Sequence, residues 1–347
     1  MASAADLRSA YANIRAQAAE QADGWPHASN VSDLCVDGRP PRFADATGPI
    51  GFYAVLHRNA EGCAMLAACK LEFEAFIALI EAVLNPTQVR ELRALLLWAS
   101  PSSWHTCVSV FQEHPSMLSD EDKARWRKVT DADAKALAAA LRERYAALEP
   151  PQLALDTLIV CADGALIAGF LETSYLAPFG ALRSASTEVG AAVLGELTSR
   201  PKRLIHVTLG RLLGVPASLS AVQRAAVASA VKTFNAGRRR PVAAATPITL
   251  PEVSLARDDV WFMTEYTELA RLPLGVPAEE SRKRERRGAG PCKKMAFVAA
   301  VLVGGLAALA ALAQPRTAAA LDGVPVRGTL TLGSWEPPEP PPRGAEP

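Results

Sequence analysis

The chain has 347 residues, 50% of them hydrophobic, and its 37 lysines and arginines nearly balance 36 aspartates and glutamates to a net charge of +1. This length allows one or two domains with a substantial core, and the small net charge excludes a global field that attracts nucleic acid, so any attraction of phosphate must be local. The six cysteines have no metal-ligand or redox spacing and indicate reduced thiols in a cytosol-like compartment; they are Cys35, Cys63, Cys69, Cys107, Cys161 and Cys292.

Residues 1–47 are predicted to form an N-terminal helix, at about residues 4–22, followed by a polar segment that contains proline and glycine. An alanine- and arginine-bearing start is also a feature of organellar transit peptides, so an organellar location stays open as an alternative. Such peptides are poor in acidic residues, however, and Asp6, Glu20 and Asp23 count against this alternative.

Apolar strands and helices follow in alternation. Residues 51–57 are predicted to form an opening strand, and residues 71–97 a first helical region. Residues 104–111 then have the composition of a strand, in which every second side chain points to the same face. One face of this strand would carry His105, Cys107 and Ser109, and the other would carry Thr106, Val108 and Val110.

The middle of the chain contains a helix, a hairpin and a second helix. Residues 119–148 favour a helix, since Ser119 is a suitable N-cap with acidic residues after it and Pro150-Pro151 end the segment. Residues 155–170 predict a β-hairpin, because Asp163-Gly164 is a turn signal between two apolar runs. Residues 183–197 are predicted to form the helix that leads to the next strand.

A second strand with a histidine is predicted at residues 204–209, where His206 and Thr208 share one face. A helix at residues 220–235 and a closing strand at residues 261–269 follow it. A single histidine in an apolar strand is more often a hydrogen-bonded core residue than a catalyst, and this structural interpretation stays open for both histidines. The occurrence of two such strands nevertheless favours a shared pocket with one proton donor and one proton acceptor.

These two strands resemble the two-histidine phosphoesterase superfamily, which includes cyclic phosphodiesterases and RNA-ligase-like proteins. The signature is a pair of His-x-Thr/Ser-apolar motifs; His206-Val207-Thr208-Leu209 matches it fully, and His105-Thr106-Cys107-Val108 matches it except at the third position. The resemblance covers about residues 48–275. It implies an α+β domain in which two lobes of duplicated antiparallel sheets surround a central groove, with helices outside.

The resemblance implies a metal-independent reaction without a cofactor, in which His105 and His206 share the acid/base work and Thr208 binds the phosphate. Cys107 would have a weaker phosphate-binding role, since a thiol is a poorer donor than a hydroxyl. The substrate would be a nucleotide or an RNA-end phosphodiester, such as a 2′,3′-cyclic phosphate. Two alternatives stay open: a catalytically weak or inactive module that binds RNA ends or nucleotides, and a membrane-anchored scaffold domain.

The C-terminal part predicts a membrane anchor. Residues 276–294 form a basic linker, residues 295–313 are an uncharged run of the length of a transmembrane helix, and residues 314–347 are a proline-rich tail predicted to be disordered. The excess of lysine and arginine before the run predicts a single span with the N-terminal domain in the cytosol. A buried apolar helix and a segment that resembles an export signal stay open as alternatives, and the sequence indicates no protein partner.

Overall fold

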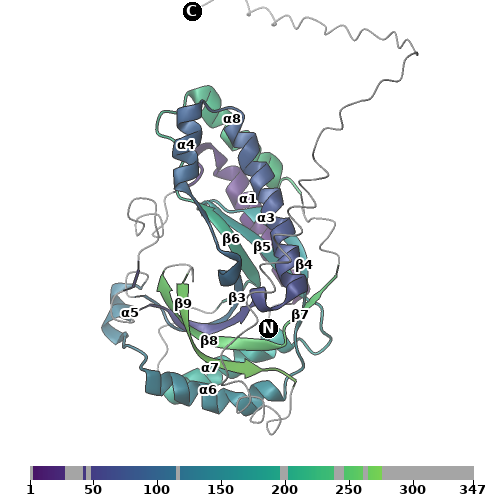
Figure 1. The fold of residues 1–347 in the computed structure, drawn as a ribbon, viewed down its shortest axis with the longest axis vertical. Coiled ribbons are helices and arrows are strands. Elements are labelled where there is room, and N and C mark those ends of the chain that lie inside the picture. The colour runs from purple at the N-terminus through teal and green to yellow at the C-terminus, as the bar shows by residue number, and fades with distance from the viewer. Residues whose placement is uncertain are drawn as a thin grey trace, which may run out of the picture. The chain divides into compact units, whose positions relative to one another are not determined.

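A computed structural model of the chain describes residues 3–27, 42–43, 48–114, 118–195, 202–237, 246–260 and 265–275. All of them belong to one structural unit, Met1–Gly288. They form an α+β fold with a four-stranded and a five-stranded antiparallel sheet (Figure 1), which confirms the predicted class and the antiparallel pairing.

The four-stranded sheet has the order β3-β1-β8-β9. Its strands are β1 (Ile50–Val55), β3 (His105–Gln112), β8 (Glu252–Val260) and β9 (Glu265–Pro273). Strand β8 was not predicted. Strand β9 coincides with the described part of the closing strand expected at residues 261–269 and continues to Pro273, and residues 261–264 lie outside the described ranges. Charged residues in β8 hide its strand pattern, although Arg257 is largely buried and pairs with Asp131 at 2.6 Å.

The five-stranded sheet has the order β2-β6-β5-β4-β7. Its strands are β2 (Leu96–Trp98), β4 (Gln152–Val160), β5 (Ala165–Glu172), β6 (His206–Leu212) and β7 (Ile248–Thr249). The predicted hairpin is β4–β5, and Gly164 in its turn has φ +81°, a conformation that favours glycine. A Cβ atom there would lie 2.0 Å from the carbonyl oxygen of Leu212, so the close approach of β6 also requires glycine.

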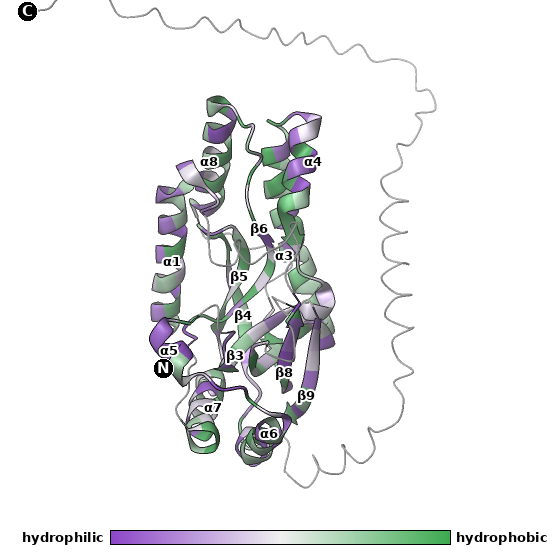
Figure 2. Cartoon of the chain, turned by 90° about the vertical axis from the view of Figure 1, so that its left-hand side faces the viewer, coloured by the Kyte–Doolittle hydropathy of each residue, from purple (hydrophilic) through white to green (hydrophobic). Residues whose placement is uncertain are grey.

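The helices pack on the two sheets, and those in Figure 2 carry both hydrophilic and hydrophobic residues. Helices α1 (Ala4–Glu20) and α8 (Ala221–Asn235) contact β4, α3 (Ala60–Glu81) contacts β5, and α4 (Pro86–Leu95) contacts β2. Helix α6 (Asp131–Ala146) contacts β9, and α7 (Pro178–Leu194) contacts β3. The predicted helices near residues 4–22, 183–197 and 220–235 therefore exist, with shifted ends.

The single helix predicted at residues 119–148 is wrong, because the structure has two helices there. The first is α5 (Asp120–Arg125), and α6 begins anew at Asp131. Thr130 caps α6 by accepting a hydrogen bond from the backbone N–H of Asp133 while the Asp133 carboxylate accepts from the N–H of Thr130. This capping box stabilises a new helix start inside a segment whose composition favours helix throughout.

Helix α1 is part of the packing around β6. The hydroxyl of Tyr11 lies 2.6 Å from the carbonyl oxygen of Ile205 and 3.1 Å from the backbone nitrogen of Phe170. It can donate to the first and accept from the second. Gly169 leaves space for the ring, since a Cβ atom there would lie 2.9 Å from Tyr11. Helix α1 therefore supports the residue directly before His206.

The predicted basic linker, transmembrane helix and tail, residues 276–347, lie outside the described residues. Within the described ranges, no helix has the length and apolar character needed to cross a bilayer.

Candidate functional site

His105 is the first residue of β3, and a backbone carbonyl fixes the orientation of its ring. Its Nδ1 lies 2.7 Å from the carbonyl oxygen of Ser103. Because a carbonyl only accepts, Nδ1 carries a hydrogen and Nε2 is left for other chemistry. The ring of Tyr53 packs edge-on against the imidazole, with 5.0 Å between ring centroids. Burial lowers the pKa of His105, although the hydrogen bond to Ser103 acts in the opposite direction.

His206 is the first residue of β6, and its surroundings differ. Its Nδ1 is buried and has no hydrogen-bond partner among the described residues. Burial lowers the pKa of His206 to about 4, and the nearby positive charges of His105 and Arg183 add to this effect. His105 and His206 begin β3 and β6, and these two strands contact each other.

Strands β3 and β6 belong to different sheets, yet they lie next to each other. The guanidinium of Arg183 contacts the carbonyl oxygens of both Cys107, at 3.1 Å, and Leu204, at 2.6 Å. Further along, Lys202 forms an ion pair with Glu113 at 3.0 Å. Arg183 joins Cys107 to Leu204, and the ion pair joins Glu113 to Lys202, so the residue numbers increase along β3 where they decrease along residues 202–204. The two segments therefore run antiparallel.

Cys107 and Thr208 occupy the third positions of the two motifs and are half-buried, like the histidines. The burial of β3 and of the first residues of β6 alternates, which confirms that His105 and Cys107 share one face, as do His206 and Thr208. Burial raises the pKa of the Cys107 thiol to about 12. The thiol is therefore neutral at physiological pH, a weak donor and no thiolate nucleophile.

Tyr53 is a candidate site residue that the sequence analysis missed. It lies opposite Cys107 in the β1–β3 pairing and packs against His105, so it belongs to the same face. Burial raises its pKa well above the usual value, and the negative charge of Asp258 adds to this effect, so its hydroxyl stays protonated. Only the register of β1 with β3 identifies Tyr53, because residues 51–57 contain no motif.

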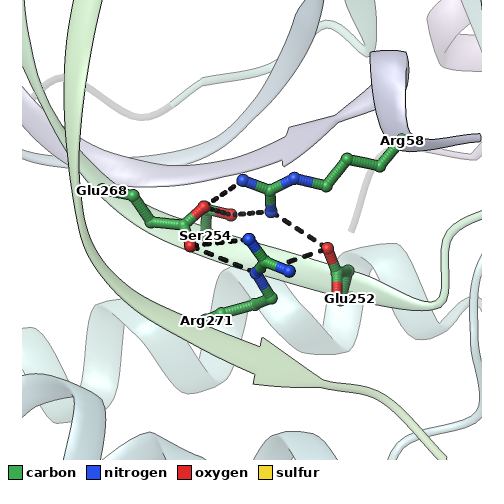
Figure 3. A network of polar contacts seen from close by, with 5 residues as sticks. All are labelled: Arg58, Glu252, Ser254, Glu268 and Arg271. Carbon is green, nitrogen blue, oxygen red and sulfur yellow. Dashed lines mark hydrogen bonds and ion pairs between the residues drawn. The ribbon is translucent and has the colours of Figure 1, made fainter. Parts of the chain in front are cut away.

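A cluster of charged residues connects β8, β9 and the turn that follows β1 (Figure 3). Ser254 of β8 pairs with Tyr53, so the cluster is two strands away from Cys107, or roughly 10 Å at the usual strand spacing. Ion pairs and hydrogen bonds connect its members, which are Arg58, Glu252, Ser254, Glu268 and Arg271. The two arginines and two glutamates balance in charge, so the cluster is neutral overall.

Arg58 is the centre of this charged cluster. Its Nη1 donates to Glu252 and to Ser254, each at 2.9 Å, and its Nη2 pairs with Glu268. Burial alone would raise the pKa of Glu268, but the contact with Arg58 outweighs it and the pKa is lowered. No sequence pattern predicts this cluster, because its members come from residues 58 and 252–271 and share no motif.

A cavity of about 670 Å³ lies between α1, α7, β3 and the segment that leads into β6. Ser109, Arg183 and Ile205 line it, but His105, Cys107, His206 and Thr208 do not. This cavity is therefore not the predicted groove between the two histidines.

Among the residues that the structure describes, no group of three or more histidine, cysteine, aspartate or glutamate side chains could hold a metal ion.

No family model and no curated protein matches this chain. One solved structure that resembles it is that of TT0787 from Thermus thermophilus, which is 18% identical over 66% of this chain and 98% of that chain, with a TM-score of 0.33.

Proposed function

We propose that this chain is a phosphoesterase that hydrolyses a nucleotide or RNA-end phosphodiester, such as a 2′,3′-cyclic phosphate, by metal-independent catalysis between His105 and His206. One observation supports the proposal: β3 and β6, which begin with His105 and His206, belong to different sheets and contact each other. The contact with Ser103 occupies Nδ1 of His105 and leaves its Nε2 without a protein partner among the described residues. Nδ1 of His206 is fully buried, so Nε2 of this ring would be the nitrogen that faces the substrate.

The two histidines would have different roles. Burial lowers the pKa of both histidines. The hydrogen bond to the Ser103 carbonyl opposes this effect at His105, whereas the positive charges of His105, Arg183 and Lys202 add to it at His206. A bound phosphodiester carries a negative charge and would stabilise one imidazolium. His105 is then the general acid and His206 the general base, and their titrations are coupled.

The reaction consumes one water. His206 accepts a proton from this water while the oxygen of the water forms a bond to phosphorus. The bond from phosphorus to one ribose oxygen breaks, and His105 gives its proton to that oxygen, so a phosphomonoester is produced. Solvent then returns the proton from His206 to His105. Thr208 would donate a hydrogen bond to a non-bridging phosphate oxygen, where charge accumulates in the transition state.

Local positive charge would attract the anionic substrate, since the net charge of the chain is only +1. Arg183, Lys202 and Arg211 all act on His206. Lys202 and Arg211 form ion pairs with Glu113 and Asp163, so Arg183, which has no ion-pair partner among the described residues, would be the main source of attraction for a phosphodiester beside this histidine.

A binding module without turnover is the second candidate, and Cys107 is the observation that favours it. The neutral, buried thiol at the third position of the first motif is a weak donor toward phosphate. Such a site could bind an RNA end or a nucleotide without stabilising the transition state enough for hydrolysis. The anchor at residues 295–313 and the cytosolic orientation stay part of both proposals.

The test is hydrolysis of the four 2′,3′-cyclic nucleoside monophosphates, and of an RNA oligonucleotide with a cyclic end, by the full-length chain in the presence of EDTA. We expect turnover that His206→Ala and His105→Ala each lower by about 100-fold or more, while His27→Ala, a change at a histidine outside the site, leaves it intact. Binding of these ligands without turnover would establish the module instead. If the chain neither binds nor hydrolyses these ligands, both proposals are contradicted and the scaffold alternative is left.

A further inference from the structure

Arg183 of α7 has an unusual set of partners. Its guanidinium is directed at four backbone carbonyl oxygens, two on each side. On β3 it reaches Val108 from Nε at 3.2 Å and Cys107 from Nη2 at 3.1 Å. On the segment entering β6 it reaches Arg203 from Nη1 at 3.3 Å and Leu204 from Nη2 at 2.6 Å.

Among the residues that the structure describes, no ladder of backbone hydrogen bonds joins β3 to β6. In the described part of the chain, β3 pairs with β1, and β6 pairs with β2 and β5. Arg183 therefore takes the place of strand-to-strand hydrogen bonds where the two sheets meet. The planar, forked guanidinium can span both sets of carbonyls at once, whereas an ammonium group cannot.

Arg183 is mostly buried, and burial lowers its pKa. Among the described residues no carboxylate forms an ion pair with it, and the ring of Phe179 lies 4.9 Å from its guanidinium carbon. Burying a cation without a paired anion is unfavourable unless hydrogen bonds replace its hydration. The backbone carbonyls supply these bonds, so the position of Arg183 depends on both strands together.

We infer that Arg183 is a positioning residue for the two-histidine site, because its guanidinium ties the strand of His105 to the segment that enters the strand of His206 and so sets the spacing of the two imidazoles. Its effect on catalysis rests on the proposed function, whereas its effect on the spacing does not. Arg183 itself touches neither imidazole in the contacts that the structure gives.

Arg183→Lys separates geometry from charge. Lysine keeps the positive charge beside His206 but cannot hold four carbonyls. Arg144→Lys is the matched control, since Arg144 lies on α6, is exposed, and pairs with Glu188 of α7 at 2.7 Å. Circular dichroism and thermal unfolding would show whether both variants keep the fold.

The measurement is the electrostatic coupling between the two imidazoles, taken from NMR titrations of histidine-labelled protein. The groups that act on His206 are His105 from β3, Arg183 from α7, Lys202 from the preceding segment and Arg211 from β6. His105→Gln should raise the pKa of His206, because it removes one of these positive charges. We expect this rise to fall to half or less in the Arg183→Lys background, and to be unchanged in the Arg144→Lys background.

The inference would be overturned if Arg183→Lys folds and His105→Gln raises the pKa of His206 in it by as much as in the wild-type chain. On the substrate that is turned over, kcat should fall by about 10- to 100-fold with KM changed by less than about threefold, because misplacement of catalytic groups affects mainly the chemical step. If Arg183→Lys does not fold, Phe179→Leu replaces it: loss of the ring beside the guanidinium should weaken the coupling, and an unchanged coupling would again overturn the inference.

The two proposals fail separately. A coupling that depends on Arg183 in a protein that hydrolyses no phosphodiester would remove the proposed function and leave the positioning role. Turnover together with a coupling that does not depend on Arg183 would support the proposed function and remove the positioning role.

Discussion

Strands β3 and β6 begin with the same residue type, yet they place it in different surroundings. His105 has one ring nitrogen fixed by the Ser103 carbonyl and packs against Tyr53. His206 has a buried nitrogen without a partner in the described part of the chain, and it lies among positive charges. Burial lowers the pKa of both imidazoles; the hydrogen bond to Ser103 opposes this effect at His105, whereas the positive charges around His206 add to it. The motif alone defines a pair, and its surroundings assign the roles.

The strongest test of this difference is the pH dependence of hydrolysis. Removing either histidine should lower kcat by about 100- to 10,000-fold, the usual contribution of a general acid or base. The residual activity of His206→Ala should lose the limb that rises with pH, because the base is gone, and that of His105→Ala should lose the limb that falls at high pH. Identical residual profiles would contradict the assignment of acid and base.

The stability of the fold should depend on pH through His206 in particular. Its pKa is lowered from 6.5 to about 4 in the folded chain, so the unfolded chain binds more protons between these values and acidification destabilises the fold. Above pH 6.5 this contribution is constant. His206→Gln should therefore reduce the loss of unfolding free energy between pH 7 and pH 4.5 by about 2 kcal/mol.

Urea denaturation at the two pH values measures this effect. Thr208→Val is the control, since it changes the neighbouring residue on the same face without removing a titratable group. An equal pH dependence in His206→Gln and the wild-type chain would show that His206 is not held neutral by burial.

Support from helix α1 also distinguishes the two strands. Tyr11 bonds the backbone next to His206 and makes no such contact with β3. Tyr11→Phe keeps the ring but removes one of two donors to the Ile205 carbonyl, since the backbone N–H of Phe170 also donates to it at 2.8 Å. The free energy of unfolding should therefore fall by about 1 kcal/mol, the usual net contribution of one hydrogen bond. Chemical denaturation measures this loss, and Tyr175→Phe, at a fully exposed tyrosine, should change it by less than about 0.5 kcal/mol.

The smallest expected effect concerns the third position of the first motif. Cys107→Ser makes the two motifs alike by replacing a weak donor with a hydroxyl of similar shape, so kcat/KM should rise by about two- to tenfold. Cys63→Ser on α3 is the control and should have no effect. A fall in kcat/KM for Cys107→Ser would indicate that the thiol contributes packing rather than a donor.

Much of the local structure follows from the sequence, because its causes lie within a few residues. Alternating burial in β3 and β6, the Gly164 turn and the Ser220 cap of α8 are all of this kind. Strand β8 escaped prediction because Arg257 interrupts its apolar pattern, and only the distant Asp131 explains how that charge is buried. The break between α5 and α6 escaped because helix-favouring composition on both sides conceals the Thr130 cap.

The sequence by itself determined which side chains of the two histidine strands share a face, since the period of a strand is a local property of the backbone. The tertiary structure alone decided that these strands belong to different sheets, run side by side and are linked by Arg183. Residues about 100 positions apart meet only when two complete sheets pack, and that packing depends on burial summed over the whole core rather than on any local pattern. The environment of His206, and with it the proposed division between acid and base, arises at this level.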